Sequence, residues 1–106
     1  MELYEVVALS EARDDISNIA DYINNQFKNE KLATALVIEL WATIRKLDFM
    51  PTRFGIVEEP LLYERSIRQI RHKQYTIYYV VDEANKKVRV IRVKHALQDL
   101  NKFFGI

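Results

Sequence analysis

The amino-acid sequence predicts a single α+β domain over residues 1–106, in which a hairpin of two helices covers one face of a small, mostly antiparallel sheet. Apolar residues recur every three or four positions between residues 11 and 49, which indicates two amphipathic helices. Residues 65–95 are rich in Val, Ile and Tyr, which indicates strands. A chain of 106 residues with 49% hydrophobic content is expected to bury one core.

The first two elements are predicted from the residues before position 28. Residues 3–9 are apolar and contain Val and Tyr, so we expect a strand there. Ser10 offers a side-chain oxygen to the free amides at a helix start, and Glu11 suits the first turn. A helix is therefore predicted over residues 11–27. Its apolar stripe consists of Ile16, Ile19, Ala20, Ile23 and Phe27.

A second helix is expected to begin after Asn29, whose side chain can cap it. Its apolar stripe consists of Ala33, Leu36, Val37, Leu40, Trp41, Ile44 and Leu47. Pro51 cannot continue a helix, so this helix is predicted to stop near residue 49. Residues 51–64 contain both prolines and one of the two glycines, and we expect an irregular connection.

Three strands are expected after this connection, over residues 65–72, 75–82 and 87–95. Residues 82–86 are predicted to form the hairpin loop between the last two. Residues 97–104 are expected to form a short final helix that ends at Gly105. The predicted order is β-α-α-β-β-β-(α), in which the two long helices bury their apolar stripes against one face of the sheet.

Charge is distributed unevenly along the chain. Residues 65–95 hold nine Lys and Arg against two acidic residues, whereas residues 1–50 hold five basic and nine acidic ones. The formal net charge of the whole chain is only +1. Because the helices cover one sheet face, we expect the other face to carry most of the strand Lys and Arg. Such a surface predicts a polyanion or an acidic protein segment as a partner.

Several classes of protein are disfavoured by composition. The chain has no cysteine, which excludes disulfides and thiolate metal sites. Its first residues lack the pattern of a signal peptide, and no apolar run reaches the length of a membrane span, so a cytoplasmic location is expected. The strands offer no cluster of carboxylates for a catalytic metal, and no phosphate-binding or dinucleotide motif is present. We therefore expect no metal and no cofactor.

Four segments together resemble the RelE/ParE superfamily of toxins from type II toxin–antitoxin systems. They are SEARDDISNIADYI, IRKLDFMPTRFG, SIRQIRHKQYTIYYVVDE and VRVIRVKHALQD, and they cover most of the chain in the family's order. The resemblance implies a RelE/ParE-like fold and neutralisation by a cognate antitoxin protein. It also implies one of two targets. RelE-like members cleave mRNA on the ribosome without a metal, whereas ParE-like members act on DNA gyrase and lack the nuclease residues.

Metal-free RNA cleavage requires a proton acceptor and cations that stabilise the phosphorane. The candidate catalytic residues are Arg71, Lys73, Arg92 and His95. His95 is the best-placed titratable group, although it could equally end its strand in a structural hydrogen bond to the region of Asp99. His72 is expected to be a surface residue.

Two departures from the nuclease pattern favour the ParE-like branch. Thr76 stands where RelE-like toxins usually carry an arginine after the tyrosine that opens the middle strand, and Ala96 stands where another arginine often follows the last strand. No tyrosine follows Tyr79, whereas several nucleases of the superfamily end with a functional one. We therefore expect growth inhibition by binding a target. The alternatives are an mRNA endonuclease and a non-toxic binding module.

Binding of partners is expected to use the strand cations. The candidates are Arg68, Arg71, Lys73, Arg89, Arg92 and Lys94. The alternative is that these side chains only form a solvent-exposed face of the strands and bind no partner. Tyr75, Tyr78 and Tyr79 could stack on bases, but three tyrosines in a central strand more often belong to the core. Leu62, Phe103 and Phe104 are candidates for an apolar surface that an antitoxin covers, and packing at the core edge is equally compatible with them.

Overall fold

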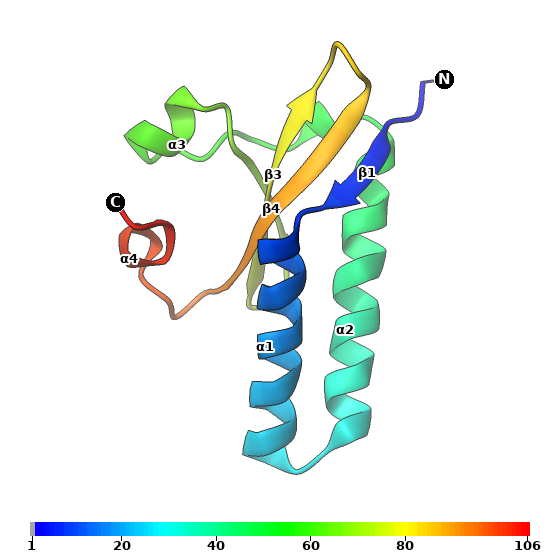
Figure 1. The fold of residues 1–106 in the computed structure, drawn as a ribbon, viewed down its shortest axis with the longest axis vertical. Helices are drawn as coiled ribbons and strands as arrows, with labels where there is room; N and C mark the ends of the chain where they lie inside the picture. Colours follow the sequence, from blue (N-terminus) through cyan, green and yellow to red (C-terminus); the bar gives the residue numbers. More distant parts are fainter. Residues whose placement is uncertain (1) are drawn as a thin grey trace.

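The computed structural model describes residues 2–106 and confirms the α+β fold class (Figure 1). The long elements are β1 (Glu5–Ala8), α1 (Ser10–Phe27), α2 (Glu30–Arg45), β2 (Arg68–His72), β3 (Tyr75–Asp82) and β4 (Lys87–His95). Two short helices, α3 (Pro60–Glu64) and α4 (Leu100–Phe104), flank the last three strands. No helix among residues 2–106 is both long enough and apolar enough to cross a membrane.

The four strands form one mixed sheet in the order β1-β4-β3-β2. β1 pairs in parallel with the first half of β4, and the other two pairings are antiparallel. The register between β3 and β4 shifts once: Tyr78 lies opposite Arg92, whereas Tyr79 lies opposite Val90. Ile91 is therefore the extra residue of a β-bulge, which turns the second half of β4 relative to the first.

The helices α1 and α2 run antiparallel and cover one face of the sheet (Figure 1). The connection between them is tight because Lys28 adopts the left-handed conformation, with φ 52°. Asn29 caps α2 as predicted, since its Oδ1 accepts a hydrogen bond from the N–H of Leu32 at 3.1 Å. The core between helices and sheet contains Ala12, Ile16, Leu40, Ile44, Leu47, Ile70, Tyr75, Ile77, Tyr79, Val88, Val90 and Val93, with Trp41 partly buried at its edge.

A second, smaller apolar cluster lies on the opposite face of the sheet. Its buried members are Val57, Leu62, Ile67 and Tyr78, and Val80, Ile91, Leu100 and Phe104 pack against them. The helices α3 and α4 supply three of these residues, Leu62 from α3 and Leu100 and Phe104 from α4, and both helices lie away from α2 in Figure 1. The face away from the long helices, which was expected to carry most of the strand Lys and Arg, is therefore also partly apolar.

The connection predicted to be irregular contains ordered turns. A 3-10 turn spans Pro51–Arg53, and α3 begins at Pro60, where Glu59 Oε2 accepts a hydrogen bond from the N–H of Leu62 at 2.9 Å. Both prolines take the first position of a helical turn, where a missing N–H costs nothing. A proline therefore marks the start of structure here, although in the sequence it indicates a break.

The remaining differences concern the ends of elements. The helix α1 begins at Ser10 itself, and no side chain caps it. α2 ends at Arg45 and continues as a 3-10 turn, Lys46–Asp48. β2 begins only at Arg68, because Ser66 has a positive φ of 56° and cannot continue a strand.

Candidate partner-binding site

The six strand cations predicted to bind partners have very different surroundings. Arg68 Nη1 donates to the carbonyl oxygens of Thr52 and Phe54, at 3.2 and 2.6 Å. Arg89 Nη1 donates to Asp82 Oδ2 at 3.1 Å. These two side chains therefore hold neighbouring segments of the chain, and their donors are partly used within the molecule.

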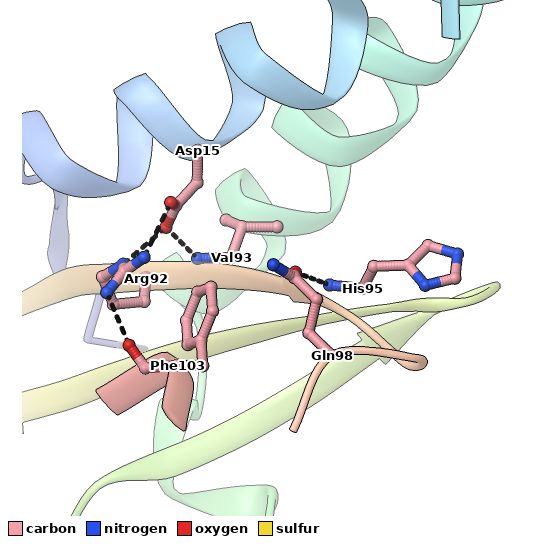
Figure 2. Close-up of polar contacts among 6 residues, drawn as sticks. All are labelled: Asp15, Arg92, Val93, His95, Gln98 and Phe103. Carbon is pink, nitrogen blue, oxygen red and sulfur yellow. Dashed lines mark hydrogen bonds and ion pairs between the residues drawn. The ribbon is translucent and has the colours of Figure 1, made fainter. Parts of the chain in front are cut away.

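Arg92 joins β4 to α1 and α4 (Figure 2). Its Nε and Nη2 donate to the two carboxylate oxygens of Asp15, at 2.7 and 3.0 Å, which makes a bidentate ion pair. Its Nη1 donates to the carbonyl oxygen of Phe103 at 3.2 Å, and the guanidinium lies 3.8 Å from the centre of that ring. Asp15 Oδ2 also accepts the N–H of Val93 at 2.9 Å. The hydrogen bonds to Asp15 raise the pKa of Arg92.

His95 ends β4 with both ring nitrogens engaged. Its Nδ1 accepts a hydrogen bond from the N–H of Leu97 at 3.0 Å, and its Nε2 lies 3.2 Å from Gln74 Oε1. Since Nδ1 is an acceptor, the neutral ring carries its proton on Nε2 and donates it to Gln74. A general base needs a free lone pair, and that of Nδ1 is already occupied. This geometry favours the structural interpretation of His95, with Leu97 as partner where the region of Asp99 was expected.

Lys73 and His72 share one acceptor on α2. The Nζ of Lys73 and the Nε2 of His72 lie 2.8 and 2.7 Å from the same oxygen, Glu39 Oε1. The hydrogen bond from Lys73, followed by that from His72, lowers the pKa of Glu39. His72 is thus half-buried and bonded, which differs from the exposed residue that its position beside a turn predicts.

Arg71, Thr76 and Lys94 lie side by side on three neighbouring strands. The register places Arg71 opposite Thr76 and Thr76 opposite Lys94, so the three side chains share the face away from α1 and α2. Lys94 is only 7% exposed, and its Nζ donates to the carbonyl oxygens of His95 and Gln98, both at 3.0 Å. Within residues 2–106, neither Arg71 nor Lys94 forms an ion pair with a carboxylate.

The tyrosines of β3 belong to the two cores, in agreement with the structural interpretation. Tyr75, Tyr78 and Tyr79 are buried, so their rings have no free face on which a base could stack. The hydroxyl of Tyr79 donates to the carbonyl oxygen of Pro51 at 2.6 Å. Burial raises the pKa of Tyr79 to about 12, against the smaller opposing effects of Arg68 and Arg53.

A shallow groove of about 310 Å³ lies between α3, α4 and the bulged part of β4. The predicted apolar contacts Leu62 and Phe104 line it, but Leu62 is buried and Phe104 half-buried against Tyr78. The exposed apolar residues at this groove are instead Leu9, Leu61 and Ile106. They come from three distant parts of the chain, so no local sequence pattern could have indicated them.

The four residues of the predicted nuclease set are held in separate surroundings. Arg92 is paired with Asp15, Lys73 with Glu39, and His95 with Leu97 and Gln74, as described above. Of the three cations in this set, only Arg71 forms no ion pair within residues 2–106. No group of three or more His, Asp or Glu side chains within residues 2–106 could hold a metal ion.

Comparisons with known proteins agree with this architecture. The model of one protein family, described as the ParE toxin of the type II toxin–antitoxin system parDE, matches residues 6–100. A chain of the chromosomal ParDE toxin–antitoxin system from P. aeruginosa superposes with a TM-score of 0.72 at 13% sequence identity, covering 88% of this chain and 96% of that chain. A chain of the toxin–antitoxin complex RelBE2 from Mycobacterium tuberculosis has a TM-score of 0.62 at 20% identity, with 90% and 93% covered.

No curated protein matches this sequence. The structural likenesses, both below 25% identity, establish a RelE/ParE-like fold. The family model spans the chain from β1 to the start of α4. The chain is therefore a member of the ParE toxin family of type II toxin–antitoxin systems.

Proposed function

We propose that this toxin inhibits growth by binding DNA gyrase, and that a cognate antitoxin protein neutralises it. Membership of the ParE family supports both parts, because the resemblance to the ParE-like branch implies this target. Both similar structures come from toxin–antitoxin systems, which supports an antitoxin as the partner of this chain.

One observation carries the choice of binding over RNA cleavage. Two of the four residues that a metal-free nuclease would use, Arg92 and His95, have donors or a lone pair occupied within the molecule. One edge of the Arg92 guanidinium donates to both carboxylate oxygens of Asp15, Nη1 donates to the carbonyl oxygen of Phe103, and the Nδ1 lone pair of His95 accepts the N–H of Leu97. A cation that must stabilise a phosphorane, or a base that must accept a proton, cannot act while its donors or lone pair are engaged.

Expression in growing cells tests this proposal. We expect growth arrest without new mRNA ends inside translated codons. His95→Ala should arrest growth as wild type does, provided that thermal unfolding shows it folded. Cleavage in translated codons that disappears in His95→Ala or Arg71→Ala would establish the ribosome-dependent endonuclease instead. The absence of any arrest would leave a non-toxic binding module.

The target itself is tested with purified components. Supercoiling of relaxed plasmid by DNA gyrase should fall when the toxin is added, and the effect should weaken as salt is raised, because screening reduces the attraction of exposed charges. Normal supercoiling at a toxin concentration above that of gyrase would exclude this target. An effect that is independent of salt would exclude an electrostatic contribution of the basic strands.

A further inference from the structure

Arg71 and Lys94 flank the same residue, Thr76, across the sheet, and neither forms an ion pair with a carboxylate within residues 2–106. They occupy the ends of the row Arg71, Thr76 and Lys94, described above, on one face of the sheet. Lys94 is almost wholly buried, and buried charges in proteins are normally paired with an opposite charge. Burial and the charge of Arg71 both lower the pKa of Lys94, so the folded chain disfavours this arrangement.

The neighbouring acidic group does not compensate for this excess. Asp99 raises the pKa of Lys94, but less than burial and Arg71 lower it. Its carboxylate is already used as the cap of α4, where Oδ1 accepts the N–H of Lys102 at 3.1 Å. The Nζ of Lys94 meets only carbonyl oxygens, those of His95 and Gln98. One further anion at this place would therefore be attracted by both cations.

We propose that Arg71 and Lys94 form a subsite for one carboxylate of an acidic polypeptide partner, in which exposed Arg71 contacts the carboxylate and buried Lys94 adds a fixed positive charge behind it. This inference rests on the proposed binding function and deepens it. The guanidinium of Arg71 presents a fork of donors that matches a carboxylate. The remaining strand cations are already engaged: Lys73, Arg89 and Arg92 each have a carboxylate, and Arg68 donates to two backbone carbonyl oxygens.

A polypeptide carboxylate fits this face better than the phosphates of RNA. A nucleic-acid strand needs a track of several cations and exposed aromatic rings. The subsite offers two cations, and the tyrosines of β3 are buried. The same face carries the groove with the exposed apolar residues Leu61 and Ile106. A peptide segment that combines an acidic residue with apolar neighbours would engage both features.

The subsite is tested by NMR titration of the intact toxin with a capped peptide of four glutamates. We expect saturable shifts of the backbone amides of Arg71, Thr76 and Lys94 and of the Arg71 Nε–H. The titration of the Lys94 side chain should move to higher pH when the peptide is bound. A peptide of four glutamines should produce neither change.

Matched variants decide whether the subsite is specific. Arg71→Gln should weaken binding of the glutamate peptide roughly tenfold, the loss of one charge-assisted contact. Arg13→Gln, which removes an exposed arginine from α1, should leave the affinity unchanged. Amide spectra of both variants should overlay on wild type away from the substitution. Lys94→Met, checked in the same way, should weaken binding less than Arg71→Gln.

Three results would overturn the subsite. The first is shifts spread over all exposed Lys and Arg without saturation. The second is equal weakening by Arg13→Gln and Arg71→Gln. The third is a tetranucleotide of RNA that binds through Arg71 more tightly than the peptide, which would assign the pair to phosphate. None of these results depends on gyrase. The toxin can leave supercoiling unchanged and still bind the peptide, or inhibit supercoiling without binding the peptide, so the two proposals are tested separately.

Discussion

At the scale of single residues, this fold is held by polar side chains that bridge distant segments. Asp15 bonds Arg92 and Val93, and Tyr79 bonds Pro51. Arg92 is separated from Asp15 by 77 positions in the chain. Sequence reasoning named Arg92 and His95 as candidate site residues. It could not show what holds Arg92, because Asp15 looks like an ordinary exposed acid on an amphipathic helix.

Tyr79→Phe tests the buried hydrogen bond at Pro51. The substitution keeps the ring in the core but leaves the carbonyl oxygen of Pro51 without its donor. We expect a loss of about 1–2 kcal/mol in the free energy of unfolding. Urea denaturation measures it, and Tyr63→Phe at an exposed position should change stability by less than about 0.5 kcal/mol. Equal effects of the two substitutions would contradict a structural role for this hydroxyl.

Asp15→Ala tests the cluster around Arg92. The change leaves a half-buried guanidinium without its carboxylate and the N–H of Val93 without an acceptor. We expect a loss of roughly 2–3 kcal/mol in the free energy of unfolding. The control is Asp14→Ala, which removes an exposed acidic side chain from the preceding position of α1. A loss no larger than that of the control would show that the ion pair contributes little to stability.

At the scale of elements, the sequence predicted what local patterns determine. The apolar stripes of α1 and α2, the cap at Asn29 and the three later strands are all present. Short elements were missed or shifted because tertiary contacts determine them. Ile56, for instance, forms an isolated antiparallel bridge with Arg68 at the start of β2, which a periodicity of a few residues cannot reveal.

Lys28→Gly should stabilise the turn between the two long helices. Lys28 ends α1 with φ 52° and ψ 41°, a conformation that is unfavourable for a side chain with a Cβ and ordinary for glycine. After the greater entropy of glycine in the unfolded chain is subtracted, we expect a gain of about 0.5 kcal/mol. Lys31→Gly, inside α2, should instead destabilise by up to about 1 kcal/mol. Thermal denaturation of both variants would refute this account if their effects had the same sign.

The hairpin between β3 and β4 should make stability depend on pH in acid. Two hydrogen bonds from Asn85, and then one from Arg89, lower the pKa of Asp82 from 3.8 to about 2. A carboxyl whose pKa is lower in the folded than in the unfolded state stabilises the fold above pH 4, and this contribution disappears as the pH falls toward 2. In urea denaturation from pH 6 to pH 2, Asp82→Asn should have a lower free energy of unfolding than wild type near pH 6. Its free energy of unfolding should also fall less steeply as the pH is lowered. Curves of unfolding free energy against pH that run parallel for the variant and wild type would contradict this contribution of Asp82.

At the scale of the whole molecule, the uneven charge of the sequence becomes a distribution over two sheet faces. One face is buried under α1 and α2, and the other is shared by a small apolar cluster and by basic side chains. Counting charges in the sequence predicted that basic groups are present, but it could not show which of them are free to bind a partner. Three of the six strand cations, Lys73, Arg89 and Arg92, are paired internally, because acidic residues from the long helices and the end of β3 reach them. Arg71 is the exposed exception on the strands.

This distribution supports a toxin that acts by occupying its target. Two residues that RNA cleavage would require, Arg92 and His95, are engaged within the fold, whereas Arg71 and an apolar groove are exposed. A protein of this kind inactivates one target molecule for each molecule bound, whereas an enzyme inactivates many.

The stoichiometry of inhibition therefore tests the central claim most directly. Purified toxin is titrated against a fixed concentration of DNA gyrase, and the residual supercoiling activity is measured. The account predicts a fall that is proportional to the toxin bound and complete only near equal molar amounts. Gyrase that keeps full activity throughout, together with multiple-turnover cleavage of mRNA on ribosomes by the same preparation, would contradict it.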